Sequence, residues 1–325
     1  MRYTISCALA SLLPSLAPGL AHAEVPKVVT DIPPVHALVS LVMGDLGQPQ
    51  LLLAKGADEH DFALKPSQMR GISDATLAVW IGPELTPWME RALQGSSAAQ
   101  LALLDAPGTE RRNFAEGGGD HDHDHAGEED HDHAAEGEAE HDHEGEEHEH
   151  HHTGTDPHAW LDPENAMVWT GLIAAELTRL DPENAATYAA NAEAARARIA
   201  TLDADLKTQL APVADKPFVA FHDAYGYFTA HYGLQPAGHL ALGDASTPGA
   251  AHITELRAEI AAGGIVCLFP EVQHDPALLT QLSEGSSVRI GGALDPVGSS
   301  LEPGPAAYET LLHSIADTLS DCLKG

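Results

Sequence analysis

The sequence is poor in basic residues, in aromatic residues and in cysteine. Its 325 residues include 16 Lys and Arg against 49 Asp and Glu, so the formal net charge is −33. A chain this acidic is repelled by nucleic acid and by anionic membrane surfaces, which excludes both as partners and favours cations. Aromatic residues make up only 5%, but an apolar content of 43% is sufficient for the cores of two ordinary domains or of one large domain.

The N-terminus has the pattern of a cleavable secretory signal. Arg2 is followed by an apolar run over residues 5–20 and then by the A-x-A sequence Ala21-His22-Ala23. A membrane anchor is the alternative, but the run contains two prolines and is too short, since a helix needs about 20 residues to span a bilayer. We therefore expect a signal peptide over residues 1–23, cleaved after Ala23, and a soluble exported protein.

Only three cysteines are present. Cys7 lies inside the signal, too early to carry a lipid at the cleavage site. The remaining pair, Cys267 and Cys322, predicts a disulfide, because an even number of cysteines in an exported protein is normally oxidised. Two buried free thiols are the alternative. There is no C-x-x-C motif, which indicates a structural and not a catalytic pair.

Short apolar runs alternate with helical segments along most of the chain, which predicts an α/β fold with parallel sheets covered by helices. The predicted strands are residues 28–30, 51–53, 77–81, 101–104, 218–221, 265–269 and 288–290. The predicted helices are residues 35–43, 66–72, 85–93, 163–179, 182–210, 225–231, 254–262, 276–284 and 308–323.

We expect these elements to form two α/β lobes joined by a long helix. The N-terminal lobe is predicted to cover residues 24–162, the linking helices residues 163–212 and the C-terminal lobe residues 213–325. The helix predicted over residues 182–210 is the long one. At 1.5 Å per residue it would span roughly 43 Å, enough to run alongside both lobes.

Residues 116–152 form an acidic, histidine-rich insertion in the first lobe. They contain 16 Asp and Glu, 11 His and no Lys or Arg. Because the segment has almost no apolar side chains to offset its ordering entropy, we expect it to be disordered without metal. Its His-x-His repeats predict weak multivalent zinc capture, with a solvated charge run as the alternative. An H-E-x-x-H match at residues 148–152 lacks the apolar helical face that a metalloprotease site requires.

Three histidines outside the insertion lie at strand ends or in loops, where open α/β sheets bind their ligands. They are His60, His158 and His222, and each has a carboxylate within two residues. Such a carboxylate can orient an imidazole and raise its basicity as a metal ligand. For the other histidines of these lobes we expect structural roles; they are His36, His231, His252, His274 and His313.

Four segments resemble, in order, motifs of the cluster A-I periplasmic metal-binding proteins. They are residues 56–61 with Lys65-Pro66-Ser67 after them, residues 156–163, residues 221–228 and residues 269–273. The resemblance covers essentially the whole mature chain. Within the family, the histidine-rich insertion and the paired cysteines are similar to those of the zinc-binding subunits of bacterial ABC importers.

The resemblance implies a set of site residues. His60, His158 and His222 match the three zinc-binding histidines of the family. The fourth ligand is left open between Glu59, a water molecule and Asp295. His239 matches a residue of an auxiliary metal site that also uses the histidine-rich loop, and Cys267 and Cys322 match the family's disulfide.

The resemblance also implies a function. We expect a monomeric periplasmic protein, not an enzyme, that captures Zn(II) in the cleft between its lobes and delivers it to an ABC permease in the inner membrane. Three imidazoles and one oxygen suit Zn(II), whereas Mn(II) prefers more oxygen ligands. Two alternatives are kept. One is a zinc metallohydrolase with Glu59 as general base, and the other is a zinc buffer without a transporter.

Overall fold

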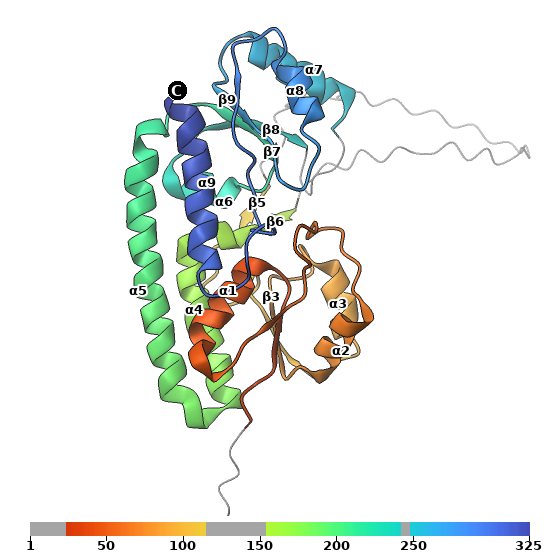
Figure 1. Cartoon of the computed structure of the whole chain (residues 1–325), viewed down its shortest axis with the longest axis vertical. Helices are drawn as coiled ribbons and strands as arrows, with labels where there is room; N and C mark the ends of the chain where they lie inside the picture. Colours follow the sequence, from red (N-terminus) through yellow and green to blue (C-terminus); the bar gives the residue numbers. More distant parts are fainter. Residues whose placement is uncertain (1–23, 115–153, 242–247) are drawn as a thin grey trace, which may run out of the picture.

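The computed structural model describes residues 24–114, 154–241 and 248–325. Two four-stranded parallel sheets lie in separate lobes, and three long helices run beside them (Figure 1). Within the described residues, no helix is both long enough and apolar enough to cross a membrane. The predicted α/β class and the two-lobe arrangement are confirmed.

The N-terminal lobe is built on a sheet with the strand order β2-β1-β3-β4. Its strands are β1 (Val28–Thr30), β2 (Gln50–Leu51), β3 (Leu77–Trp80) and β4 (Ala99–Ala102). Its helices are α1 (Pro33–Met43), α2 (Pro66–Asp74) and α3 (Pro87–Leu93). Every residue of β1 and β3 is buried, as expected for central parallel strands covered on both faces. All of these elements correspond to predicted ones, with ends that differ by a few residues.

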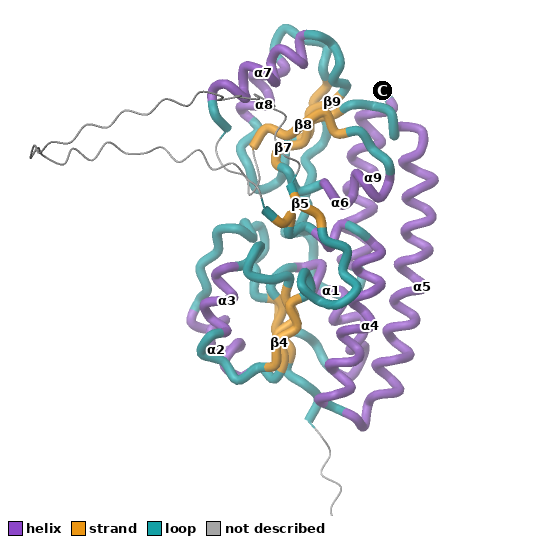
Figure 2. The backbone as a smooth tube through the Cα atoms, turned by 180° about the vertical axis from the view of Figure 1, so that it is seen from behind, coloured by secondary structure: helices purple, strands orange, loops and turns teal. Residues whose placement is uncertain are grey.

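The C-terminal lobe repeats this architecture with the strand order β10-β9-β7-β8. Its strands are β7 (Phe218–His222), β8 (Pro236–Ala241), β9 (Cys267–Phe269) and β10 (Arg289–Ile290). Its helices are α6 (Gly226–Tyr232), α7 (Ala250–Ala261) and α8 (Ala277–Ser283). A two-residue antiparallel pair, β5 (Arg112–Asn113) with β6 (Thr155–Asp156), lies between the two lobes (Figure 2).

Strands β5, β6 and β8 are absent from the predicted set. β8 begins at Pro236 and contains Gly238, two residue types that are unusual in strand interiors. These residues are tolerated because β8 lies at the edge of its sheet, where the missing N–H of a proline can face the side that has no neighbouring strand. β5 and β6 contain only two residues each, too few for any periodicity to show.

The helices α4 (Pro163–Leu180), α5 (Ala185–Leu210) and α9 (Ala307–Lys324) connect the lobes. α5 contacts α1 and α4 on one side and α6 and α9 further along, so it runs past both sheets (Figure 1). It begins three residues later than predicted, because Pro182–Asn184 forms a 3-10 turn. α4 begins as its sequence predicts, with the side chain of Asp162 accepting a hydrogen bond from Glu164 N at 2.8 Å.

A disulfide joins Cys267 on β9 to Cys322 on α9, which confirms the predicted pairing. The two residues are 55 positions apart in the sequence, and their Cα atoms are 6.3 Å apart. The bond therefore fastens the C-terminal helix to the second sheet. Since α9 also contacts α1, this helix lies against elements of both lobes, and the predicted domain boundaries stay a prediction.

Candidate metal centre

The three predicted ligand histidines come from three separate segments. His60 lies in the loop between β2 and α2, His158 follows β6, and His222 is the last residue of β7. In two of the loops an aspartate two residues earlier fixes the turn. Asp58 Oδ1 accepts a hydrogen bond from His60 N at 2.8 Å, and Asp156 Oδ1 accepts one from His158 N at 2.9 Å. The repeated Asp-x-His spacing therefore positions both imidazoles through the backbone.

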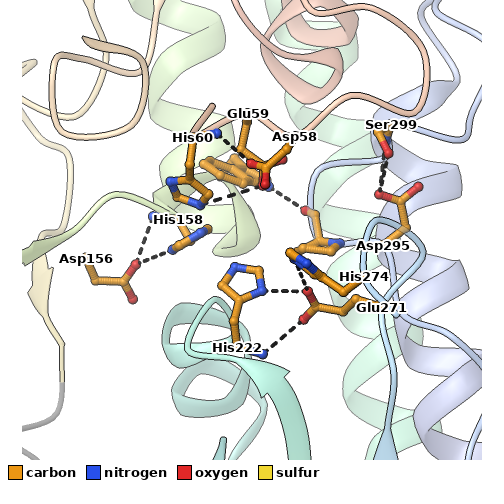
Figure 3. A network of polar contacts seen from close by, with 12 residues as sticks. Asp58, Glu59, His60, Asp156, His158, His222, Glu271, His274, Asp295 and Ser299 are labelled. Carbon is orange, nitrogen blue, oxygen red and sulfur yellow. Dashed lines mark hydrogen bonds and ion pairs between the residues drawn. The ribbon is translucent and has the colours of Figure 1, made fainter. Parts of the chain in front are cut away.

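The three rings converge on one point (Figure 3). Their centroids are 5.6 Å apart for His60 and His158, 5.9 Å for His60 and His222, and 5.4 Å for His158 and His222. The Nε2 atom of each ring is buried and has no hydrogen-bond partner within the described residues. With Glu59, they form a group whose possible ligand atoms all lie within 4.8 Å of one another. We call these four residues the buried centre.

The other nitrogen of two rings is held by a carboxylate. His158 Nδ1 lies 2.8 Å from Asp156 Oδ1, and His222 Nδ1 lies 2.6 Å from Glu271 Oε2. A carboxylate at Nδ1 accepts the hydrogen bond from that nitrogen and turns Nε2 towards the centre, which is the usual arrangement behind metal-binding histidines. Glu271 is itself held, because the hydroxyl of Tyr225 donates a hydrogen bond to its Oε1 at 3.0 Å.

Burial determines most of the electrostatics of the buried centre. Burial, together with the neighbouring rings of His158 and His222, lowers the pKa of His60 to about 3. Burial also places the pKa of His158 well below its usual value. Burial alone would lower the pKa of His222, but the carboxylate of Glu271 outweighs it and raises that pKa to about 9. Two of the three imidazoles are therefore neutral at pH 7, with lone pairs available to a cation.

Glu59 belongs to the buried centre, whereas Asp295 does not. Glu59 is 2% exposed, and its Oε1 lies 4.0 Å from His60 Nε2. Its backbone carbonyl accepts a hydrogen bond from Trp88 Nε1 at 2.9 Å, which fixes the loop. Burial raises the pKa of Glu59 to about 8.

The carboxylate of Asp295 is instead occupied by its own loop (Figure 3). It accepts hydrogen bonds from Ser299 N at 3.0 Å, from Ser300 N at 2.9 Å and from the Ser300 hydroxyl at 2.6 Å. A metal ion would have to compete with these donors. Of the two side chains considered for the fourth position, Glu59 is therefore better placed.

His239 lies on β8, outside the buried centre. Its Nδ1 is 3.7 Å from Asp223 Oδ1, and its carbonyl is 2.8 Å from His252 Nε2. It lines a cavity of about 540 Å³ that also reaches His222, Asp156 and Phe114. The histidine-rich loop predicted to share an auxiliary site with His239 lies outside the described residues, as does the signal peptide predicted over residues 1–23.

Two residues beside the centre were not predicted from the sequence to take part in metal binding. Glu271 is a carboxylate that follows the buried strand β9, next to β7 in the sheet, and it lies in residues 269–273, the fourth of the segments that resemble family motifs; both were available signals. His274, expected to be structural only, has its ring centroid 6.1 Å from that of His222. Its proximity comes from the fold of the loop after β9 and is not visible in the spacing of the sequence.

The comparisons with known proteins identify the family of this chain. The family model described as zinc-uptake complex component A, periplasmic (ZnuA), matches residues 28–322. A relative named high-affinity zinc uptake system protein ZnuA, from Paracoccus denitrificans, is 59% identical over 306 residues, covering 93% of each chain. The protein of the same name from Brucella suis is 40% identical over 306 residues, covering 91% of each chain.

Solved structures share the fold. The SBP FpvC from Pseudomonas aeruginosa, in complex with Mn²⁺, gives a TM-score of 0.74 at 18% identity, over 92% of this chain and 99% of that one. The periplasmic zinc-binding protein TroA from Treponema pallidum gives 0.71 at 20% identity, over 92% and 99%. These identities are low, so the family assignment depends on the sequence matches. The chain belongs to the ZnuA family of periplasmic zinc-uptake components.

Proposed function

We propose that this chain is the periplasmic zinc-binding subunit of a bacterial ABC importer, acting as a monomer that captures Zn(II) and delivers it to a permease in the inner membrane. The observation that supports this most directly is the convergence of three buried Nε2 atoms, none of which has a hydrogen-bond partner within the described residues. Buried polar atoms are normally paired, so three orphans aimed at one point favour an ion as their partner.

The donor set fits Zn(II). Three imidazole nitrogens and one carboxylate oxygen give the four ligands of a tetrahedral zinc site, with Zn–N distances of about 2.0–2.1 Å. His60, His158 and His222 would supply the nitrogens, and Glu59 the oxygen. Asp156 and Glu271 would hold two of the rings from behind. In this arrangement the zinc ion is cargo, so its ligands have to release it as well as bind it.

The ligands come from both sides of the interlobe cleft. His60 is carried by the N-terminal lobe, His222 ends the central strand β7 of the C-terminal lobe, and His158 lies between them after β6 (Figure 3). An ion bound to all three connects the two lobes. The two lobes would therefore meet differently with and without zinc. A permease would recognise the surface that the two lobes form together.

A zinc hydrolase uses a similar donor set, but family membership places the chain in a transport component and not in an enzyme. A zinc buffer without a transporter has the same site, so only binding to the permease separates it from an importer subunit. We expect zinc-loaded protein to stimulate ATP hydrolysis by its reconstituted importer. A failure to bind any permease would leave the buffer as the function.

The decisive test of the site is a crystal structure of the zinc-loaded protein with anomalous scattering at the zinc edge. We expect a peak in contact with His60, His158 and His222. Alanine substitution of any one of these should weaken zinc affinity by at least about tenfold. His313→Ala, at a half-buried position of α9 outside the buried centre, is the matched control. The site assignment is wrong if the peak lies elsewhere.

A further inference from the structure

A second group of metal-binding side chains adjoins the buried centre. It consists of His222, Glu271 and His274, whose possible ligand atoms also lie within 4.8 Å of one another. Glu271 Oε2 is 2.6 Å from His222 Nδ1 and 3.7 Å from His274 Nε2 (Figure 3). This outer group shares His222 with the buried centre and uses neither His60 nor His158.

The ring of His274 is held in place by its surroundings. It is stacked on Phe221, with ring centroids 4.3 Å apart and an interplanar angle of 8°. Its backbone N–H donates to the carbonyl of Glu271 at 3.3 Å, which closes the turn that carries both residues. The Nε2 atom therefore faces the Glu271 carboxylate, although 3.7 Å is longer than a hydrogen bond.

The outer group connects solvent with the buried centre. The side chain of His274 is 21% exposed, whereas those of His222 and Glu271 are 3% and 0% exposed. His222 faces both groups, with Nδ1 towards Glu271 and an unpartnered Nε2 towards His60 and His158. His274 is the most exposed histidine of the two groups: the side chain of His60 is 12% exposed, and its Nε2 atom is buried.

The distance between Glu271 and His274 suits two ligands of one small divalent cation. Ligands at about 2.05 Å from a tetrahedral ion are separated from each other by roughly 3.4 Å, close to the 3.7 Å between Glu271 Oε2 and His274 Nε2. The 2.6 Å between Glu271 Oε2 and His222 Nδ1 is a hydrogen bond, so these two atoms have to move apart when an ion binds both. Two imidazoles and one carboxylate select borderline cations such as Zn(II) and Co(II) over Mg(II) and Ca(II). The group is incomplete for tight binding, because only three protein ligands are present and one of them is shared.

We propose that His222, Glu271 and His274 form an outer site for a divalent cation, through which the ion enters and leaves the buried centre. The inference rests on the proposed function, since it requires the buried centre to hold zinc. The ion first binds His274 and Glu271 while it still carries water. It then transfers to Nε2 of His222, and Glu271 again accepts the hydrogen bond from Nδ1. The coordination bonds and this hydrogen bond change, and the proton that His222 Nε2 carries at pH 7 leaves to solvent as the ion binds.

Kinetics test this route. His274→Ala is expected to slow both zinc association and chelator-induced zinc release by about tenfold, a typical size for the loss of a residue around a metal site. The equilibrium affinity stays within about threefold of the unsubstituted protein, because both directions share the outer site. His313→Ala is the matched control and keeps both rates. Rates for His274→Ala within twofold of this control would overturn the proposal.

Anomalous scattering tests the site itself. In crystals of the His60→Ala/His158→Ala variant soaked in zinc, we expect the zinc-edge peak at His222, Glu271 and His274. No peak there, in a variant whose crystals show the native fold, would overturn the outer site. The same measurement on the unsubstituted protein separates the two ideas. A peak at His60, His158 and His222 upholds the proposed function, and its absence refutes that function whatever the variant shows.

Discussion

Glu271 Oε2 lies 2.6 Å from Nδ1 of His222, although the two residues are 49 positions apart in the sequence. The contact joins the end of β7 to the loop after β9, and both partners are buried. It fixes which nitrogen of His222 faces His60 and His158. Glu271 thus determines the direction in which one ligand of the buried centre points.

Glu271→Gln is expected to lower zinc affinity by about 10- to 100-fold, the usual effect of removing the carboxylate behind a metal-binding histidine. The glutamine keeps the size of the side chain but loses the charge that stabilises the Nδ1 proton. Competition with a fluorescent zinc chelator measures the affinity. Glu255→Gln, on the exposed face of α7, should bind as the unsubstituted protein does. Equal affinity in both variants would show that Glu271 does not orient His222.

Zinc binding is expected to release protons at pH 7. The pKa values of His222 and Glu59, raised to about 9 and about 8, leave both groups protonated at that pH, and a metal ion displaces these protons. Protons compete with zinc below these pKa values, so affinity should rise as the pH increases from 6 to about 9.

Titration calorimetry in buffers with different ionisation enthalpies counts the protons. If Glu59 is the fourth ligand, Glu59→Gln releases about one proton fewer than the unsubstituted protein at pH 7. Identical proton release in both proteins would instead indicate that water completes the site. An affinity that falls between pH 6 and pH 8 would contradict the raised pKa of His222.

Zinc is expected to stabilise the folded chain. A ligand at 100 times its dissociation constant adds about 2.7 kcal/mol to the free energy of unfolding when it binds only the folded state. Urea unfolding with and without zinc measures this increment. His222→Ala should lose it, and His313→Ala should keep it. Equal increments in the two variants would place the stabilising site away from His222.

Loss of the disulfide is expected to weaken the fold without affecting the buried centre. Replacing Cys267 and Cys322 together by alanine removes the closure of a 55-residue segment, which is worth about 4 kcal/mol in the chain-entropy model. The free energy of urea unfolding should fall by about that amount. Zinc affinity at low denaturant should not change, since neither cysteine belongs to the buried centre. A parallel loss of affinity would show that α9 positions the ligands.

His231 is expected to stabilise the contact between the C-terminal lobe and the long helices. Its Nδ1 lies 3.2 Å from Asp162, the N-cap of α4, and its Nε2 lies 2.7 Å from Asp203 on α5. His231→Ala leaves two largely buried carboxylates without this partner and should cost about 3 kcal/mol of unfolding free energy. Thermal and urea unfolding measure the loss. A change below about 1 kcal/mol would mean that water replaces the imidazole.

The predictable part of the fold is the part encoded locally. β1, β3 and β7 are short apolar runs, and α4 begins with an N-cap aspartate followed by proline, so both kinds of element are visible in the sequence. β8 is not, because its contacts with β7 override the unfavourable residues Pro236 and Gly238. Secondary structure that depends on a neighbouring strand cannot be predicted from its own residues.

The same distinction applies to the candidate site. The Asp-x-His pattern around His60 and His158 is local, and it marks two turns that present imidazoles. The partnership of His222 with Glu271 and the position of His274 depend on β7 and β9 being neighbours in the sheet. The sequence alone does not predict that these two side chains lie at hydrogen-bond distance, which is 2.6 Å here.

The helix α5 limits how the protein can open. It is continuous over 26 residues, about 39 Å at 1.5 Å per residue, and it contacts elements of both lobes. In a binding protein whose lobes are joined by flexible crossover strands, the lobes can rotate apart by a large angle. Here the helix packs against both lobes, so a large rotation would disrupt these contacts or bend the helix. We therefore expect zinc binding and release to involve small displacements of the loops and lobes against this helix, and only small differences between the zinc-free and zinc-bound surfaces.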